Sequence, residues 1–213
     1  MVRHIICFGD SLTAGFQSPT PSHPTGRDTP YGDFLQEWLG ASSLVRVSGN
    51  CGELTSEMAM RFRQDVLSHR PDYVVILGGT NDLGWNARPS DIMRNLLKMY
   101  ELSRAERVIP VPVTVPSVRI ADDGGAPDAA VWIEDHLQRR RQLNELIRAY
   151  ADSKKLAAVD LFAATAEPET GRLAAPYSND GLHLTTAGYR RFAELLFDQI
   201  FQPVCPDAPG RGA

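Results

Sequence analysis

The stretch "RHIICFGDSLTAG", residues 3–15, decides the fold class of this chain. Its first part, Arg3–Phe8, is a short apolar run of the kind found in strands that are buried on both faces. The run passes directly into Gly-Asp-Ser, so that Ser11 stands where a strand ends and a helix begins. A loop would explain the glycine and the aspartate. A nucleophile presented at the end of a strand would explain the serine as well.

Four further runs share this apolar character, and we expect each to be a strand: Leu44–Ser48, Asp72–Gly78, Arg107–Val113 and Leu156–Leu161. Pro110 and Pro112 make the third of these short or irregular, because proline cannot donate a ladder hydrogen bond. Between the strands, apolar residues recur at helical spacing, for example at Leu54, Met58, Phe62 and Val66. The alternation predicts an α/β protein, a three-layer α/β/α sandwich whose five-stranded parallel sheet has helices on both faces.

The bulk composition narrows the class of protein. A length of 213 residues favours a single domain, which we place at residues 1–201, with residues 202–213 as a flexible C-terminal tail. The net charge of -4 argues against nucleic acid as a partner. No apolar stretch approaches the ~18 residues of a membrane span, and the first residues turn polar too early for a secretory signal. Three widely spaced cysteines predict neither a disulfide framework nor a zinc site, and we expect a cytoplasmic protein.

Three long stretches follow neither the strand nor the helix period: residues 17–30, 116–130 and 166–180. Each leaves the predicted sheet at its carboxyl edge, where open α/β sheets bind ligands. Loops of this length are uncommon unless they serve a function. We expect residues 116–130, which include Gly124 and Gly125, to act as a mobile lid over the site.

A serine hydroxyl is a weak nucleophile until a base removes its proton, so Ser11 needs a partner. Among the five histidines, His183 stands out, because "SNDGLHLTTAGY" places it in a loop just ahead of the last helix. Asp180 comes three residues earlier, and in a tight turn its carboxylate can reach the imidazole. Such a carboxylate fixes the tautomer of the histidine and stabilises the imidazolium.

Acyl transfer also needs hydrogen-bond donors for the developing oxyanion. The stretch "SGNCGELT" follows the second strand, and its glycines let a backbone N–H approach a ligand closely. The stretch "GGTND" follows the third strand, and Asn81 brings a side-chain NH₂ group. Each of these stretches is common by itself. Four polar motifs from four loops at one sheet edge are hard to attribute to chance.

The four motifs resemble the four sequence blocks of the SGNH (GDSL) hydrolases, in the order of that family. They are "GDSL" with Ser11, the loop with Gly52, "GTND" with Asn81, and "DGLH" with Asp180 and His183. The glycine block matches less closely, and on a shifted register Gly49 would take the place of Gly52. The G-x-S-x-G signature of the α/β-hydrolases is absent around Ser11, which makes that fold the poorer fit.

The resemblance implies a flavodoxin-like fold and hydrolysis of esters by a Ser–His–Asp triad. Ser11 would attack the acyl carbon, His183 would act as base and then as acid, and Asp180 would orient His183. The backbone N–H groups of Ser11 and Gly52 and the side chain of Asn81 would form the oxyanion hole. Such chemistry requires no cofactor, and no cluster of side chains has metal-ligand spacing.

The sequence says less about the substrate. We expect a small-molecule ester with a short acyl chain, because the edge loops are polar and rich in proline, and an acetyl group on a sugar is one specific candidate. Asp10, Trp85 and Tyr177 are candidate pocket residues, and Tyr31 is a further ring that could stack on a sugar. We also expect Asp10 to make a structural hydrogen bond to its own loop, and Asp82 to brace or cap. Within the family, lysophospholipase or acyl-thioesterase activity is the alternative. Outside it, the alternative is a non-catalytic flavodoxin-like binding module.

Overall fold

A parallel β-sheet forms the centre of the protein, in a computed structural model that describes residues 2–120, 129–205 and 208–211. Its strands are β1 (Arg3–Gly9), β4 (Ser43–Gly49), β5 (Tyr73–Leu77) and β6 (Ile109–Pro112), in the spatial order β4-β1-β5-β6. Gly9 of β1 is level with Gly49 of β4 and with Leu77 of β5. The loops that follow these three strands therefore leave the sheet at one height. From β1 the chain first adds β4 on one side and then adds β5 and β6 on the other side, so the order of strands switches beside β1.

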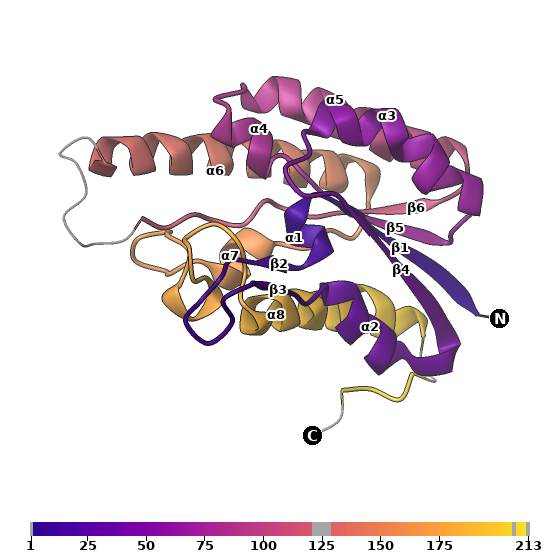
Figure 1. The fold of residues 1–213 in the computed structure, drawn as a ribbon. Coiled ribbons are helices and arrows are strands. Elements are labelled where there is room, and N and C mark those ends of the chain that lie inside the picture. The colour runs from indigo at the N-terminus through magenta and orange to yellow at the C-terminus, as the bar shows by residue number, and fades with distance from the viewer. Residues whose placement is uncertain (1, 121–128, 206–207, 212–213) are drawn as a thin grey trace.

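Helices cover both faces of the sheet, as expected (Figure 1). One face carries α3 (Thr55–Asp65), α5 (Pro89–Ala105) and α6 (Ala129–Lys154), and the other carries α2 (Tyr31–Leu39) and α8 (Thr186–Leu196). Three short helices follow strand ends or extended segments: α1 (Ser11–Ala14), α4 (Thr80–Gly84) and α7 (Leu161–Thr165). The three-layer α/β/α architecture is confirmed.

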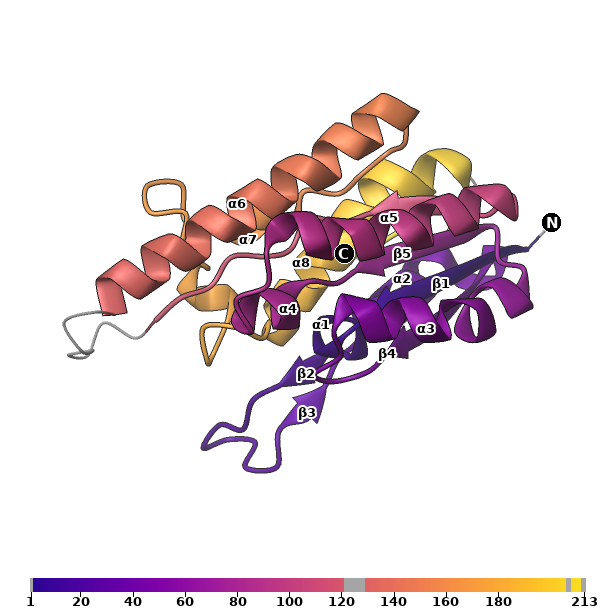
Figure 2. The ribbon, with the colours of Figure 1, turned by 90° about the horizontal axis from the view of Figure 1, so that it is seen from above.

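Smaller elements complete the described chain. Strands β2 (Phe16–Gln17) and β3 (Arg27–Asp28) pair antiparallel in a hairpin that projects from the sandwich beyond α1 (Figure 2). Helix α8 continues into a π-helical turn at Phe197–Phe201. Short 3₁₀ turns lie at Gly40–Ser42, Leu67–His69, Ala175–Tyr177 and Gln202–Val204.

The expected fifth strand at Leu156–Leu161 is wrong, because this segment makes only one parallel bridge, between Val159 and Val113. The prolines of β6 explain the difference. Ile109 donates its N–H towards β5, so the backbone nitrogens of residues 110 and 112 face the outer edge. Both of those residues are proline and cannot donate. The first donor on that edge is Thr114, which bonds the carbonyl of Val159 at 3.0 Å.

The helical stripes expected from the sequence pack mostly as predicted. Met58, Phe62 and Val66 are completely buried, whereas Leu54, just ahead of α3, is half-buried. Leu146 of α6 also falls in an apolar helical stripe, but it is 40% exposed, whereas Leu143 and Ile147 of the same helix are buried.

The last described residues pack against the domain. Cys205 is buried, and the N–H of Gly210 bonds the carbonyl of Trp38 at 3.1 Å. Arg211 forms ion pairs with Glu194 and Asp198. The described part of 202–213 is therefore not a free tail, and the end of the packed chain lies beyond residue 201.

The expected lid falls largely on residues 121–128, which lie outside the described residues, as do Gly124 and Gly125. The part of it that is described is tied down. Arg119 donates its N–H to the carbonyl of Gly181 at 2.8 Å, and Leu173 donates to the carbonyl of Val118 at 3.0 Å. A lid role for this segment stays a prediction.

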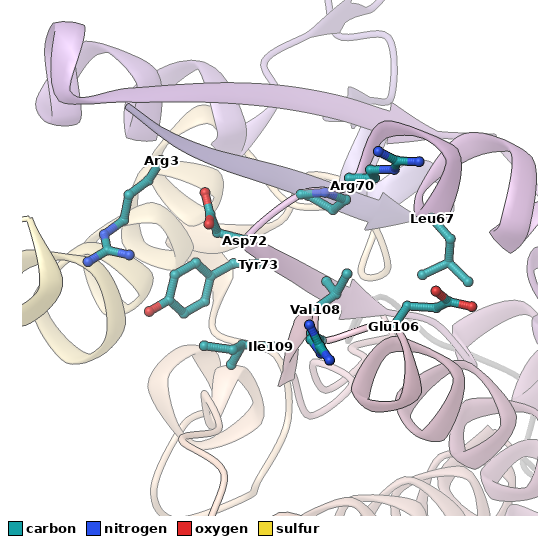
Figure 3. A pocket seen from close by; sticks show the side chains of 10 residues that line it. Arg3, Leu67, Arg70, Asp72, Tyr73, Glu106, Val108 and Ile109 are labelled. Carbon is teal, nitrogen blue, oxygen red and sulfur yellow. The ribbon is translucent and has the colours of Figure 1, made fainter. Parts of the chain in front are cut away.

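A cavity of about 400 Å³ opens at the amino edge of the sheet (Figure 3). Arg3, Tyr73 and Ile109, from the first residues of three strands, line it. Ser11 follows the opposite, carboxyl end of β1, so this cavity is separate from the predicted site. Within the described ranges, none of the helices combines the length and the apolar character that crossing a membrane requires.

Candidate active site

Ser11 is the first residue of α1, directly beyond the end of β1. Asp10 caps this helix, because its Oδ1 accepts the N–H of Leu12 at 2.9 Å and its carbonyl accepts the N–H of Thr13 at 3.0 Å. The cap turns the chain sharply from strand to helix. Ser11 is held on this turn with 5% of its surface exposed.

His183 and Asp180 come to Ser11 from the loop before α8. The Nε2 of His183 lies 3.1 Å from the Oγ of Ser11. The Nδ1 of His183 lies 2.7 Å from the Oδ2 of Asp180. The ring of Phe16 packs edge-on against the imidazole, with 4.7 Å between the ring centres. The three side chains thus form one continuous hydrogen-bonded series across 172 residues of sequence.

The Asp180 carboxylate receives more hydrogen bonds than the histidine alone supplies. Its Oδ1 accepts the N–H groups of Leu182 and His183, each at 2.8 Å. Its Oδ2 also accepts the hydroxyl of Ser18. Partial burial pushes the pKa of Asp180 upwards, but the hydrogen bonds from His183, Ser18 and the backbone outweigh it and hold the pKa well below its usual value. Asp180 is therefore an anion at neutral pH.

Two serines that support this arrangement were missed by the sequence reasoning. Ser18, from the loop after β2, contacts Asp180, which is 162 residues away in the sequence, and no local sequence pattern indicates that contact. Ser178 donates to the carbonyl of His183 at 2.7 Å and accepts the N–H of Gly181 at 2.9 Å. A serine two residues before Asp180, in a turn that contains glycine, was the available signal for Ser178.

Asn81 lies in the first turn of α4, after β5, on the same side as Ser11. Its Nδ2 donates to the carbonyl of Glu53 at 3.0 Å and lies 3.5 Å from the Oδ2 of Asp10. Glu53 belongs to the loop that contains Gly52. The two loops expected to donate hydrogen bonds to an oxyanion are therefore in direct contact.

The two candidate glycines of that loop differ in their surroundings. A side chain on Gly49 would collide with the backbone of Ala14, 2.3 Å from its nitrogen, because α1 packs against this end of β4. Gly52 has a φ of 77° and open space where its side chain would be. Its backbone is thus exposed in a left-handed turn, which favours Gly52 over Gly49 as the donor.

Asp82 and Arg61 fix the loop with Gly52. Asp82 accepts the N–H and the hydroxyl of Thr55 at 3.0 and 2.7 Å, so it caps the start of α3, as expected. Arg61, from within α3, makes a two-pronged ion pair with Glu53, with distances of 2.7 and 2.6 Å. The same guanidinium donates to the carbonyl of Gly9 at 2.9 Å. It therefore joins the end of β1 to the loop after β4.

Replacing Arg61 with methionine is expected to lower the free energy of unfolding by about 3 kcal/mol, because Glu53 would be left largely buried without its cation. Urea-induced unfolding followed by circular dichroism measures this change. Arg63→Met is the matched control on the same helix. Arg63 is 67% exposed and pairs with Glu106 at 3.9 Å, so its loss should cost at most ~0.5 kcal/mol. Equal losses in the two variants would contradict this role for Arg61.

The model of the GDSL-like lipase/acylhydrolase family matches residues 7–191, which run from β1 into α8 and include every residue of the site just described. The chain belongs to this family. The GDSL resemblance drawn from four sequence motifs is thereby confirmed.

Solved structures of similar fold include members with named activities. The chain is similar to Est24, a carbohydrate acetylesterase from Sinorhizobium meliloti, with a TM-score of 0.74, 21% identity, and coverage of 93% of this chain and 98% of the other. It is also similar to a native aryl esterase from M. smegmatis, with a TM-score of 0.72, 21% identity, and coverage of 93% of this chain and 100% of the other. A lipase/acylhydrolase from Enterococcus faecalis gives 0.71 and 25%, with both chains covered completely.

One curated relative of this GDSL-like chain is the Bacillus subtilis protein YqeF, described as an uncharacterized lipoprotein. It is 27% identical over 116 residues, which are 52% of this chain and 47% of that protein. The match thus spans about half the length of the curated relative.

A cavity of about 430 Å³ borders the site of this GDSL-like protein. Its lining includes Asn81, Trp85 and Asp180, and Trp85 is 81% exposed. The other candidate pocket residues do not line it. Asp10 is completely buried beneath the Ser11 turn, and Tyr177 is half-buried against the main core.

Tyr31, considered as a stacking ring, is also completely buried and unavailable to a sugar. Its place in the first turn of α2 accounts for this, because that turn packs under the sheet against Phe192 of α8. Trp132 of α6, which the sequence did not single out, lines the cavity and is 52% exposed.

Asp10 gives the stability of this GDSL-like domain a predictable pH dependence. Burial raises the pKa of its carboxyl to about 7, against the bond from the Leu12 N–H that lowers it. An acid with a raised pKa binds more protons when folded than when unfolded, so the contribution of Asp10 to stability falls as pH rises from ~4 to about 7. His136, whose pKa is lowered to about 4, contributes in the opposite direction. Asp10→Asn keeps a capping side chain and should remove the falling contribution. Urea titrations at pH 4, 5.5 and 7 measure it, and an unchanged slope in the variant would refute the assignment.

Proposed function

We propose that this chain hydrolyses carboxylic esters with small or short acyl groups through an acyl-enzyme intermediate. The observation that carries the proposal is the hydrogen-bonded series from the Ser11 hydroxyl through His183 to Asp180. An ionised carboxylate at the far end of this series stabilises the imidazolium that forms when His183 takes a proton.

In the first half of the proposed reaction, His183 acts as the base. The Nε2 of His183 takes the proton of the Ser11 hydroxyl while the Oγ attacks the acyl carbon. The carbonyl oxygen becomes an oxyanion, which the N–H groups of Ser11 and Gly52 stabilise. Asn81 donates one N–H to the carbonyl of Glu53, and its second N–H, which makes only a long contact of 3.5 Å with Asp10, would bind the oxyanion. His183 then gives its proton to the departing alkoxide, and the acyl group stays on Ser11.

In the second half, water replaces the alcohol. His183 removes a proton from the water while the oxygen of that water attacks the acyl carbon. The same three donors stabilise the second oxyanion. Collapse of this intermediate returns the proton from His183 to the Oγ of Ser11 and releases the carboxylic acid.

The proposed substrate, a short acyl ester of an alcohol that carries a ring, is supported by the residues that line the cavity and by the related structures. Trp85 and Trp132 present exposed rings beside the cavity, which suits a flat aromatic ring or a sugar ring in the alcohol part. A carbohydrate acetylesterase and an aryl esterase are among the proteins of similar fold. We therefore favour short acyl esters of ring-bearing alcohols over lysophospholipids and acyl thioesters.

Hydrolysis of 4-nitrophenyl acetate and 4-nitrophenyl dodecanoate tests this proposal, with kcat/KM as the readout. We expect the acetate to be turned over faster. Faster turnover of the dodecanoate would favour the lysophospholipase alternative, and faster turnover of an acyl thioester would favour a thioesterase. No hydrolysis of any of these, together with an unreactive Ser11, would indicate a binding module.

The proposed reaction uses no metal ion. Within the described part of the chain, no group of three or more His, Cys, Asp or Glu residues is placed to hold a metal. We expect EDTA to leave the hydrolysis of 4-nitrophenyl acetate unchanged. A loss of activity that zinc or calcium restores would overturn this expectation.

A further inference from the structure

Arg140, on the inner side of α6, is completely buried. Its Nη1 donates to the carbonyl of Pro116 at 2.6 Å and lies 3.4 Å from the hydroxyl of Thr80. Its Nε and Nη2 have no hydrogen-bond partner among the described residues. Within the same part of the chain, no carboxylate lies within ion-pair distance of this guanidinium, although each of the flanking arginines, Arg139 and Arg141, has an acidic partner.

An unpaired buried cation is expensive. Burial lowers the pKa of Arg140 to about 9, which still leaves the guanidinium charged at neutral pH. Buried polar groups in proteins are almost always hydrogen-bonded, and buried charges are almost always paired. Asp10 raises the pKa of Arg140 through its charge, but among the described residues it makes no hydrogen bond to the guanidinium. The two orphaned donors therefore point to a hydrogen-bond partner that the described residues do not supply.

The position of Arg140 indicates what that partner is attached to. Arg140 lines the cavity of about 430 Å³ that Asn81 and Asp180 also line. Asn81 is a proposed oxyanion donor and Asp180 a proposed member of the triad. A substrate held by Ser11 thus has the cavity with Arg140 within its reach.

The chemistry of the free edge identifies the class of group. Nε and Nη2 lie on one edge of the planar guanidinium, and this edge matches the two oxygens of a carboxylate in a bidentate pair. Burial, Arg140 and Arg139 lower the pKa of the neighbouring His136 to about 4, so His136 is neutral. Arg119 also lines the cavity and Arg139 adjoins Arg140, but these two guanidinium groups are already paired, with Glu167 and Asp135 respectively. One guanidinium edge suits one negative charge, and a phosphate dianion would retain unpaired oxygens. The apolar walls formed by Trp85 and Val118 favour the smaller charge.

We propose that Arg140 binds a carboxylate of the substrate, and that this protein therefore prefers short acyl esters that carry a carboxylate in the alcohol or in the acyl chain. This inference rests on the proposed ester hydrolysis. It adds a specificity-determining residue that the four family motifs do not contain.

Matched pairs of esters test the proposal. For the alcohol side the pair is 4-acetoxybenzoate and 4-acetoxybenzamide, which differ only in the charge of one planar group. For the acyl side it is the 4-nitrophenyl monoesters of glutarate and glutaramate, with the enzyme-free rate subtracted. The readout is the ratio of kcat/KM for the acid to that for the amide. In Arg140→Met we expect this ratio to fall by about 10- to 100-fold for at least one pair, as for the loss of a charged hydrogen bond.

Arg141→Met is the control, since Arg141 lies on the same helix, is 42% exposed, and pairs with Glu134. It should keep the wild-type ratio. Comparing ratios between variants removes the different intrinsic reactivities of the esters. An unchanged ratio in Arg140→Met for both pairs would overturn the proposal. If 4-nitrophenyl acetate is still hydrolysed in that case, the proposed function stands and only the role of Arg140 fails.

A second measurement covers the case in which Arg140→Met does not fold. In the wild type, benzoate should inhibit hydrolysis of 4-nitrophenyl acetate competitively, and benzamide at the same concentration should not. Equal inhibition by both, or by neither, would contradict a carboxylate site. Where the variant does fold, it should melt no lower than the wild type, because an apolar side chain of similar length replaces an unpaired charge.

Discussion

Ser11→Ala is expected to lower kcat for 4-nitrophenyl acetate by on the order of 10⁶. The hydroxyl is the atom that attacks the acyl carbon, and no other hydroxyl in the described chain bonds the Nε2 of His183. Melting should change little, since the Oγ of Ser11 makes its one side-chain hydrogen bond to that histidine. Steady-state kinetics, corrected with enzyme-free blanks, measure the loss of kcat.

Ser22→Ala is the matched control for this experiment. Ser22 lies in the exposed loop between β2 and β3, where its hydroxyl contacts Thr20 and His23 rather than the triad. The Ser22→Ala variant should hydrolyse 4-nitrophenyl acetate at the wild-type rate. If Ser11→Ala retained more than a tenth of wild-type turnover, Ser11 would not be the nucleophile.

Asp180→Asn is expected to lower kcat by about 10⁴ without a comparable change in KM. The remaining oxygen can still accept the N–H groups of Leu182 and His183, so the turn is kept. The new NH₂ group would then face the Nδ1 of His183 and force it to accept a hydrogen bond. The proton would sit on Nε2, and the histidine could no longer remove the proton of Ser11.

Ser18→Ala separates the charge of Asp180 from its surroundings. This change removes one hydrogen bond from the carboxylate but leaves it ionised and bonded to His183. We expect a loss of kcat of less than about tenfold, far below that of Asp180→Asn, because the carboxylate keeps its charge and its bond to His183. Comparable losses in Ser18→Ala and Asp180→Asn would mean that Asp180 acts through loop geometry rather than through its charge.

The parts of the fold that sequence could predict are those with a strong local period. The buried runs at β1 and β5 and the stripe of Met58, Phe62 and Val66 report burial directly, since neighbouring residues in one element share one environment. The run at β4 predicted the strand but not its burial, because β4 is an edge strand in which Leu44 is exposed. The prediction of a strand at Leu156–Leu161 failed although the segment is apolar, because its pairing depends on backbone N–H donors in β6. Pro110 and Pro112 remove those donors, and only the register of β6 shows on which edge their nitrogens lie.

The site divides in the same way. Ser11, Asn81, Asp180 and His183 stand in short motifs whose residue types are specific in combination, and the structure brings them together. Ser18 and Arg140 act across long separations and belong to no motif. Arg140 is the middle one of three consecutive arginines, a pattern typical of a solvated helix face. Only the rotation of α6 on the sheet shows that the middle one is buried.

The central claim is that Ser11 is an activated nucleophile. Mass spectrometry of the intact protein after treatment with a fluorophosphonate, followed by peptide mapping, tests it most directly. The account predicts one phosphonyl adduct per chain, located on Ser11, and a loss of ester hydrolysis in proportion to the labelled fraction. An unlabelled Ser11, or full hydrolysis by fully labelled protein, would contradict the account.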